Sequence, residues 1–138
     1  MIRRAGPEDM EAVFAIRAKV FIEEQGVPEA EERDDYDADA IHLIAFADNI
    51  AVGTARLLVA GATGKIGRVA VLQSYRGRGL GQGLIKAALI EFQSLGLTHA
   101  KLGAQTHAIG FYEALGFEAT GPEYMDAGIP HRDMIRAL

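Results

Sequence analysis

The stretch Val69-Ala-Val-Leu-Gln-Ser-Tyr-Arg-Gly-Arg-Gly-Leu-Gly-Gln-Gly-Leu84 decides how this chain of 138 residues folds. Its first four residues are apolar, so they suit a strand that is buried on both faces. From Gly79 onward the apolar residues recur at helical spacing, and Gly96 is well placed to end that helix. The stretch therefore predicts a central strand, a glycine-rich loop and a helix in direct succession.

The loop between strand and helix has the properties of a phosphate site. Its alternating glycines let the backbone approach a ligand closely, and the first amides of the following helix have no partner within the helix. Arg76 and Arg78 add positive charge beside these amides. We therefore expect the segment from Arg76 to Gly83 to hold a pyrophosphate, because four glycines at a helix start are poor for stability unless a ligand binds there.

Spacing excludes two familiar phosphate loops. A P-loop needs four residues between its first glycine and Gly-Lys-Ser/Thr, whereas Gly61-Ala-Thr-Gly64-Lys65-Ile66 has two and lacks the hydroxyl. The dinucleotide pattern Gly-x-Gly-x-x-Gly would need a third glycine where Gln82 or Leu84 stands.

Outward from the loop, strand and helix periods alternate without an internal repeat, which predicts one mixed α/β domain over residues 1–138. The Asp48-Asn49 pair is typical of a hairpin turn. The expected strands are residues 1–5, 41–47, 50–59, 65–72 and 100–105, with one or two more in the tail, and the expected helices are residues 7 to about 26, 79–95 and 107–115.

Composition narrows the function classes. The chain has no cysteine, which excludes a disulfide framework, a thiolate nucleophile and cysteine-ligated zinc, and we expect no metal. No apolar run is long enough to cross a bilayer, and we expect a cytoplasmic protein. The net charge of -5 argues against nonspecific nucleic-acid binding. Residues 29–39 hold seven carboxylates and Arg33, which indicates a solvated loop or, alternatively, a segment that attracts a cationic amine.

Two motifs together resemble the GCN5-related N-acetyltransferase (GNAT) superfamily. The pattern Arg76-x-x-Gly79-x-Gly81, behind an apolar strand, is similar to the coenzyme A motif of that family. The segment Phe111-Tyr-Glu-Ala-Leu-Gly-Phe117 is similar to its second signature. Residues 17–28, His42, residues 103–107 and residues 126–131 further resemble the ElaA/YjcF-like subgroup.

This resemblance implies a single mixed, mostly antiparallel sheet of six to seven strands, flanked by about four helices. The fourth and fifth strands of the family splay apart, and the pantetheine arm of acyl-CoA lies in the gap. Here those strands would be residues 65–72 and 100–105. The residues that would bind acetyl-CoA are Val69, Val71, Arg76, Gly77, Arg78, Gly79, Leu80, Gly81, Gln105, Phe111 and Tyr112.

The implied activity is direct transfer of an acetyl group from acetyl-CoA to a primary amine of a small-molecule acceptor. By resemblance, Tyr112 would act as the general acid that protonates the leaving thiolate. An amine is mostly protonated at neutral pH, so a base must take its proton. Glu24, His42 and His131 are candidates, and a water relay is an equal alternative, because Arg68 stands where many relatives carry a glutamate.

The acceptor itself stays open at the level of sequence. Arg17, Gln25, Arg56 and Arg68 could bind the carboxylate or phosphate of an acceptor, or the arginines could pair with the acidic segment. Two further alternatives are transfer from a longer acyl-CoA and a noncatalytic acyl-CoA-binding regulatory module. A homodimer is an expectation by family analogy alone.

Overall fold

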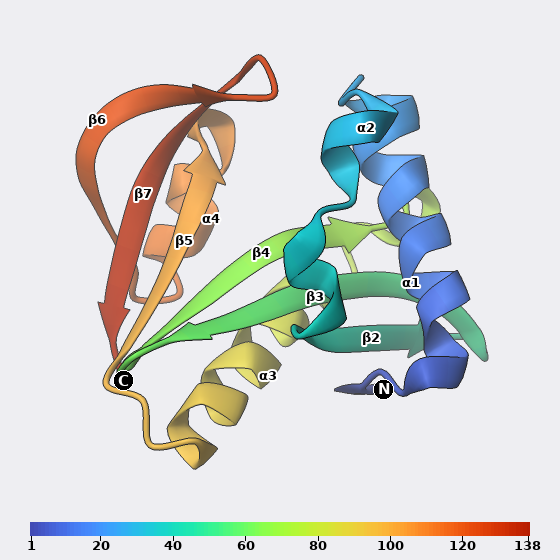
Figure 1. Ribbon diagram of the computed structural model, residues 1–138, viewed down its shortest axis with the longest axis horizontal. Coiled ribbons are helices and arrows are strands. Elements are labelled where there is room, and N and C mark those ends of the chain that lie inside the picture. Colours follow the sequence, from blue (N-terminus) through green and yellow to red (C-terminus); the bar gives the residue numbers. More distant parts are fainter.

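Seven strands form one mixed sheet in the computed structural model, which describes residues 1–138 (Figure 1). All neighbouring strands are antiparallel except β4 and β5, which are parallel. The order β1-β2-β3-β4-β5-β7-β6 joins β1 (Ile2–Arg4), β2 (Ile41–Ala47), β3 (Ile50–Ala60), β4 (Thr63–Val71), β5 (His99–Gln105), β7 (Ile129–Ala137) and β6 (Glu118–Asp126).

Four α-helices accompany the sheet, and α1 continues directly into a π-helix over Ala18–Glu24. Short 3₁₀ turns precede or follow several elements. None of the helices combines the length and apolar character that a membrane span requires. The α-helices are α1 (Met10–Arg17), α2 (Glu29–Glu32), α3 (Leu80–Ser94) and α4 (Ile109–Glu113), and the 3₁₀ turns cover Pro7–Asp9, Asp35–Ala38, Gln73–Tyr75 and Thr106–Ala108. The expected sheet and number of helices are confirmed.

The two faces of the sheet are covered by different helices, as the alternation of side chains along β2 and β3 requires. One face packs against α3, whose Leu84 and Phe92 are fully buried in the larger core cluster. The other face meets α1 and the π-helix through Ile16 and Val20, which pack against Ala70 of β4. Because both faces are covered, the central strands are apolar on both sides.

Most predicted boundaries agree with the structure to within one or two residues, and the exceptions have local causes. The Asp48-Asn49 turn is confirmed, since both residues have positive φ, 53° and 62°, as a type I′ hairpin turn requires. The strand expected from residue 65 starts two residues earlier, at Thr63, because β3 and β4 pair up to Ala60 and Thr63. The helix expected over residues 107–115 divides into a 3₁₀ turn and the five-residue α4.

The parallel strands β4 and β5 pair only at their starts. Their register runs from Thr63 opposite His99 to Ile66 opposite Leu102, and no pairing follows beyond that point. Arg68 has a φ of 48°, and the register of β4 against β3 shifts at the same place, so a bulge bends β4. Figure 1 shows the two strands leaving one corner of the sheet and diverging. The expected splay is confirmed.

Candidate active site

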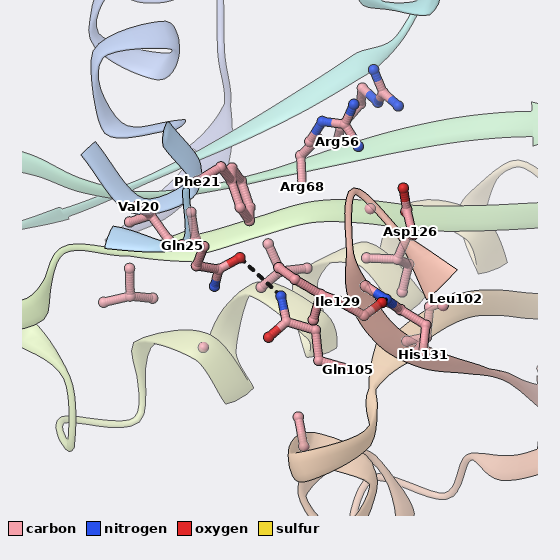
Figure 2. Close-up of a pocket in the computed structure, with 18 of the residues that line it drawn as sticks. Val20, Phe21, Gln25, Arg56, Arg68, Leu102, Gln105, Asp126, Ile129 and His131 are labelled. Atoms are coloured by element: carbon pink, nitrogen blue, oxygen red, sulfur yellow. Dashed lines mark hydrogen bonds between the residues drawn. The ribbon is translucent and has the colours of Figure 1, made fainter. Parts of the chain in front are cut away.

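A cleft of about 980 Å³ opens where β4 and β5 diverge. Its floor is the β4 backbone from Lys65 to Val71. One end, called the loop end below, is lined by residues 75–77 and 79–82 at the start of α3. The opposite end, called the arginine end, is lined by residues 30–34 together with Arg56 and Arg68 (Figure 2). The cleft therefore joins two sites of very different chemistry.

The loop end presents backbone amides that no protein group uses. Gly79 is the N-cap of α3 in a left-handed conformation with a φ of 80°, and no side chain caps the helix. The first hydrogen bond of the helix runs from the Gly83 amide to the Gly79 carbonyl over 2.9 Å, which leaves the amides of residues 80–82 unpaired. Such a helix start is an anion site, because its free amides and dipole both favour negative charge.

Gly83 has a different task from the other glycines of the loop. A Cβ atom added to it would lie 2.8 Å from Cδ1 of Ile2. Gly83 therefore permits α3 to pack closely against β1, and it does not line the cleft.

The two loop arginines point in different directions. Arg76 lines the cleft, where its Nε donates to the Val71 carbonyl at 2.9 Å and its Nη2 pairs with the Glu24 carboxylate at 2.8 Å. Arg78 is absent from the lining; its guanidinium stacks on Tyr75 and lies 3.6 Å from the carboxylate of Asp48. The structure thus keeps Arg76 beside the unpaired amides and turns Arg78 toward the β2–β3 hairpin.

The second motif, residues 111–117, lies next to the loop end of the cleft. A Cβ atom added to Gly81 would lie 3.7 Å from Cζ of Phe111, so the Phe111 side chain of α4 lies against the start of α3. Tyr112 lines the cleft beside it, with its ring edge-on to Phe111 at 5.0 Å and to Phe117 at 6.2 Å. Burial raises the pKa of Tyr112, so its hydroxyl stays protonated at neutral pH and can donate a proton.

Along the middle of the cleft, the facing edges of β4 and β5 are not paired with each other. Val69 and Val71 line it on one side and Gly103 and Gln105 on the other, in the part where the two strands no longer pair. An extended ligand arm placed between them could use the hydrogen-bonding groups that a neighbouring strand would otherwise take.

Two glutamines close over the cleft from opposite walls (Figure 2). The Gln105 side-chain amide donates to the Gln25 carbonyl oxygen at 2.9 Å, although the residues are 80 positions apart. The side-chain oxygen of Gln105 in turn lies 2.7 Å from Nε2 of His107. The structure therefore brings together a residue expected at the acceptor and one expected at the cofactor.

Of the three candidate bases, only His131 lines the cleft. Its Nδ1 lies 2.7 Å from the Ile129 carbonyl, which can only accept, so in the neutral ring Nδ1 carries the proton and Nε2 has the lone pair. Its ring stacks on Tyr124 at 5.8 Å between centroids. These contacts hold the imidazole in one orientation and in the tautomer that a base needs.

The other two candidates lie outside the cleft, which argues against both as bases. The Glu24 carboxylate is engaged by Arg76. His42 is buried behind the acidic segment, where its Nε2 lies 3.0 Å from the Asp37 carbonyl. A buried histidine with such a partner is a structural group, and a substrate amine in the cleft has no access to it.

Tyr124 lines the cleft and was missed by sequence reasoning. Its hydroxyl donates to Asp133 Oδ1 at 2.9 Å, and burial together with that carboxylate raises its pKa to about 12. A Cβ atom on Gly103 would collide with this hydroxyl. Glycine inside a strand signals the close approach of another group, and this signal could have directed attention to the neighbouring strands.

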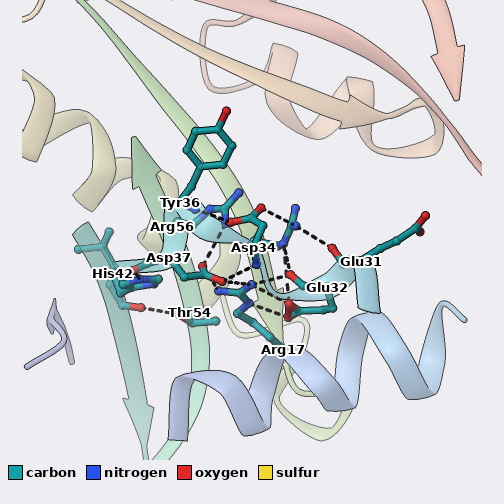
Figure 3. Close-up of polar contacts among 11 residues, drawn as sticks. Arg17, Glu31, Glu32, Asp34, Tyr36, Asp37, His42, Thr54 and Arg56 are labelled. Atoms are coloured by element: carbon teal, nitrogen blue, oxygen red, sulfur yellow. Dashed lines mark hydrogen bonds and ion pairs between the residues drawn. The ribbon is translucent and has the colours of Figure 1, made fainter. Parts of the chain in front are cut away.

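At the arginine end, Arg17 is fully buried and does not reach the cleft. Its Nε and Nη2 each donate to one oxygen of Glu32 at 2.6 Å, and its Nη1 donates to Asp37 at 2.7 Å (Figure 3). The expectation that Arg17 binds an acceptor is therefore wrong, since all of its nitrogens are used within the protein. It anchors the acidic segment to α1.

Arg56 and Arg68 do line the cleft, and both contact the same segment. Arg56 Nη1 donates to Asp34 at 2.6 Å and to Asp37 at 3.0 Å. Arg68 Nη2 lies 3.3 Å from Asp34, and its Nε donates to the Glu32 carbonyl at 3.2 Å. The alternative that the arginines pair with the acidic segment agrees with these contacts.

The acidic segment is consequently not a simple solvated run. Glu32 is 2% exposed. Burial opposes ionisation of Asp37, but hydrogen bonds from Arg17, the Asp34 amide and Arg56 outweigh it and hold the pKa of Asp37 well below its usual value. Three of the seven carboxylates are thus neutralised by arginines, which weakens the interpretation that the segment attracts a cationic amine.

Comparisons with known proteins agree with the fold and the cleft. The family model described as "Acetyltransferase (GNAT) domain" matches residues 5–138. The N-acetyltransferase YjcF of Bacillus subtilis is 34% identical over 130 residues, which are 94% of this chain and 93% of YjcF. The crystal structure of Escherichia coli ElaA superimposes with a TM-score of 0.85 at 29% identity, covering 99% of both chains. PaiA N-acetyltransferase of Thermoplasma acidophilum, solved in complex with coenzyme A, shares the fold at a TM-score of 0.78 and 19% identity, covering 100% of this chain and 98% of PaiA.

Proposed function

Since the chain belongs to the GNAT family of N-acetyltransferases, we propose that it transfers an acetyl group from acetyl-CoA directly to a primary amine of a small-molecule acceptor. The observation that carries this proposal is the cleft itself. In this cleft, the facing edges of β4 and β5 are not paired with each other, and the start of α3 next to them has three amides without a partner. An extended arm ending in a pyrophosphate, which is the shape of coenzyme A, matches that sequence of groups.

The donor would lie along the cleft from the loop end to its middle. The amides of residues 80–82 and the glycine backbone before them would hold the pyrophosphate, and Arg76 would exchange its Glu24 contact for a phosphate oxygen. The pantetheine arm would pair with the backbone of Val69 and Val71. Gln105 would contact the arm through its side-chain amide once its bond to Gln25 opens.

The transfer would proceed through one tetrahedral intermediate. The neutral amine nitrogen attacks the thioester carbon, and a carbon-nitrogen bond forms while the carbonyl oxygen takes the negative charge. An amide of β4 near Val71 would stabilise this oxyanion. The carbon-sulfur bond then breaks, and the thiolate leaves with the proton of the Tyr112 hydroxyl as a thiol.

His131 would take the proton of the attacking amine at its Nε2, either directly or through one water. Its geometry favours it over Glu24 and His42, because it alone lines the cleft and presents a free lone pair. The variant His131→Gln should lose about 100-fold in kcat. The exposed His99 provides a matched control, since His99→Gln should change nothing. Equal activity of His131→Gln and wild type would instead favour a water relay.

The test of the proposed function is a screen of primary amines with acetyl-CoA in which thiol release and N-acetylated product are both measured. Product formation with release of one thiol per amide establishes the transfer. Repeating the screen with longer acyl-CoA donors separates an acetyltransferase from a long-chain acyltransferase. Tight acetyl-CoA binding with no product from any amine would contradict the proposal and point to an acyl-CoA-binding regulator.

A further inference from the structure

The arginine end of the cleft contains a partly buried polar network with equal numbers of positive and negative side chains. Six residues form this network, called the arginine network below. Its members are Arg17, Arg56, Glu32, Asp34 and Asp37, which Figure 3 labels, and Arg68. The formal charges of the network sum to zero, so what it can bind depends on which of its hydrogen-bonding groups have no partner.

The carboxylates of the network have little capacity left. Both oxygens of Glu32 accept from Arg17 at 2.6 Å. Asp37 accepts from Arg17, from Arg56 and from the backbone amide of Asp34 at 3.1 Å. One oxygen of Asp34 accepts from Arg56 and the other from Arg68. A cationic group that arrived here would find its natural partners already taken.

The guanidinium groups, by contrast, have donors left over. Arg17 uses all three nitrogens, but Arg56 uses only Nη1. The Arg56 side chain is 8% exposed, and its Nε is buried without any partner. The Nε and Nη2 of Arg56 form one edge of its guanidinium group. In Arg17 the same edge donates side-on to both oxygens of Glu32. A buried donor without an acceptor costs stability, so this edge is suited to a planar anion.

Arg68 stands beside this edge and is also incompletely paired. Its Nη1 has no partner, and its nearest carboxylate oxygens lie at 3.3 and 4.0 Å. Burial lowers the pKa of Arg68, and repulsion from Arg56 and Arg17 lowers it further, against the opposing effect of Glu32 and Asp34. Arg68 thus lies beside a second incompletely paired guanidinium, that of Arg56, and its unused Nη1 can donate to an anion.

Both arginines line the cleft on the far side of the reaction region from the loop end. Arg68 precedes Val71 by three positions on β4, and the bulge at Arg68 makes this span shorter than in a fully extended strand. An acceptor whose amine lies near Val71 and His131 could therefore extend its other end to the arginine network.

We propose that the acceptor is an aminocarboxylate, whose carboxylate binds side-on to Arg56 and is contacted by Arg68, while its amine points to the acetyl group. This inference rests on the proposed function and assigns the substrate class of the same cleft. The carboxylate is preferred to a phosphate because the free edge of Arg56 presents two parallel donors in one plane.

The first test compares four acceptors that share one carbon skeleton: an amine with a carboxylate, its primary amide, its phosphate ester counterpart and the amine without any acidic group. The carboxylate should have the highest kcat/KM, by about 10- to 100-fold over the amide. Equal or faster acetylation of the amide or of the plain amine would overturn the inference and leave the acetyltransferase intact. Preference for the phosphate would also overturn it. If no amine is acetylated although acetyl-CoA binds, the proposed function fails as well.

The second test asks whether the arginines cause the preference. The variant Arg68→Gln removes a charge from a partly exposed side chain and should lower the ratio of kcat/KM for carboxylate over amide by about 10-fold. Arg56→Lys keeps the charge and loses the planar edge, and it should lower the ratio similarly. Lys86→Gln removes an exposed charge on α3 outside the cleft and serves as the control. An unchanged ratio in Arg68→Gln and in Arg56→Lys would overturn the inference.

Discussion

The two ends of the cleft differ in what they are made of. The loop end is built from consecutive backbone amides at the start of one helix, and its main requirement is glycine at positions with positive φ, such as Gly79. The arginine end is built from side chains of α1, α2, β3 and β4 that are distant in sequence. A site made of backbone amides is therefore local and tolerates changes of side chain. A site made of side chains depends on each of the charged groups that pair within it. Four variants test this contrast.

The largest effect should come from breaking the arginine network at its buried centre. The variant Arg17→Gln leaves the Glu32 and Asp37 carboxylates without their main partner, and we expect the free energy of unfolding to fall by about 3–5 kcal/mol. Chemical denaturation measures this change. Lys19→Gln, which removes an exposed ion pair with Glu23, should change it by less than about 0.5 kcal/mol. A similar loss in both variants would show that the network does not anchor the fold.

The next effect concerns the chemistry between the two ends. Tyr112→Phe keeps the ring that packs on Phe111 and Phe117 but removes the proposed proton donor, so kcat should fall about 100-fold with little change in the KM for acetyl-CoA. Steady-state kinetics provide the measurement. Tyr36→Phe is the matched control, because Tyr36 is 64% exposed and lies outside the cleft. Unchanged kcat in Tyr112→Phe would remove this residue from the mechanism.

A smaller effect is expected at the loop end. Gly79 and Gly96 have φ values of 80° and 75°, and open space surrounds the position of a Cβ atom at both. Alanine at either site should cost about 1–2 kcal/mol of stability, because it strains the backbone equally. Only Gly79→Ala should weaken acetyl-CoA binding, by about 10-fold, since it displaces the amides that we propose as the pyrophosphate site. Calorimetric titration decides; equal affinity in both variants would locate the pyrophosphate elsewhere.

The smallest effect is a pH dependence of stability that belongs to the arginine end. The pKa of Asp37 is lowered in the folded protein, so its ionised form stabilises the fold above about pH 4, the pKa region of an unfolded aspartate. This contribution is lost as the pH falls from there toward the folded pKa. The Tm of wild type should thus decline more steeply between pH 6 and pH 3 than that of Asp37→Asn, whereas the exposed Asp35→Asn should follow wild type. Parallel curves for all three would contradict the role of Asp37.

Much of the fold could be predicted because it is encoded in local patterns. The start of α3 at Gly79, its end near Gly96 and the Asp48-Asn49 turn all depend on which residues tolerate a positive φ. The π-helix over Ala18–Glu24 could not be predicted, because its apolar spacing does not distinguish it from an ordinary helix. It nevertheless brings Phe21 to the wall of the cleft.

The site divides in the same way. The glycine-rich loop and Tyr112 could be proposed from the sequence because each belongs to a short contiguous motif, although contact between the two motifs, through Gly81 and Phe111, is a tertiary fact. The bond between Gln25 and Gln105 and the stacking of His131 on Tyr124 join residues on different elements. The spacing of these residues along the sequence does not indicate that they are in contact.

The strand, loop and helix at the centre of this protein follow from its sequence alone, because backbone geometry depends on residues that are neighbours in the chain, whereas the expectation of an acyl-CoA ligand came from the resemblance of two motifs to the GNAT family. Only the tertiary structure decided the roles of the charged residues. Arg17 became an internal anchor, Arg56 kept a free edge and Arg78 turned away from the cleft. The role of a charged side chain depends on the groups around it, and these groups come from elements that only folding brings together.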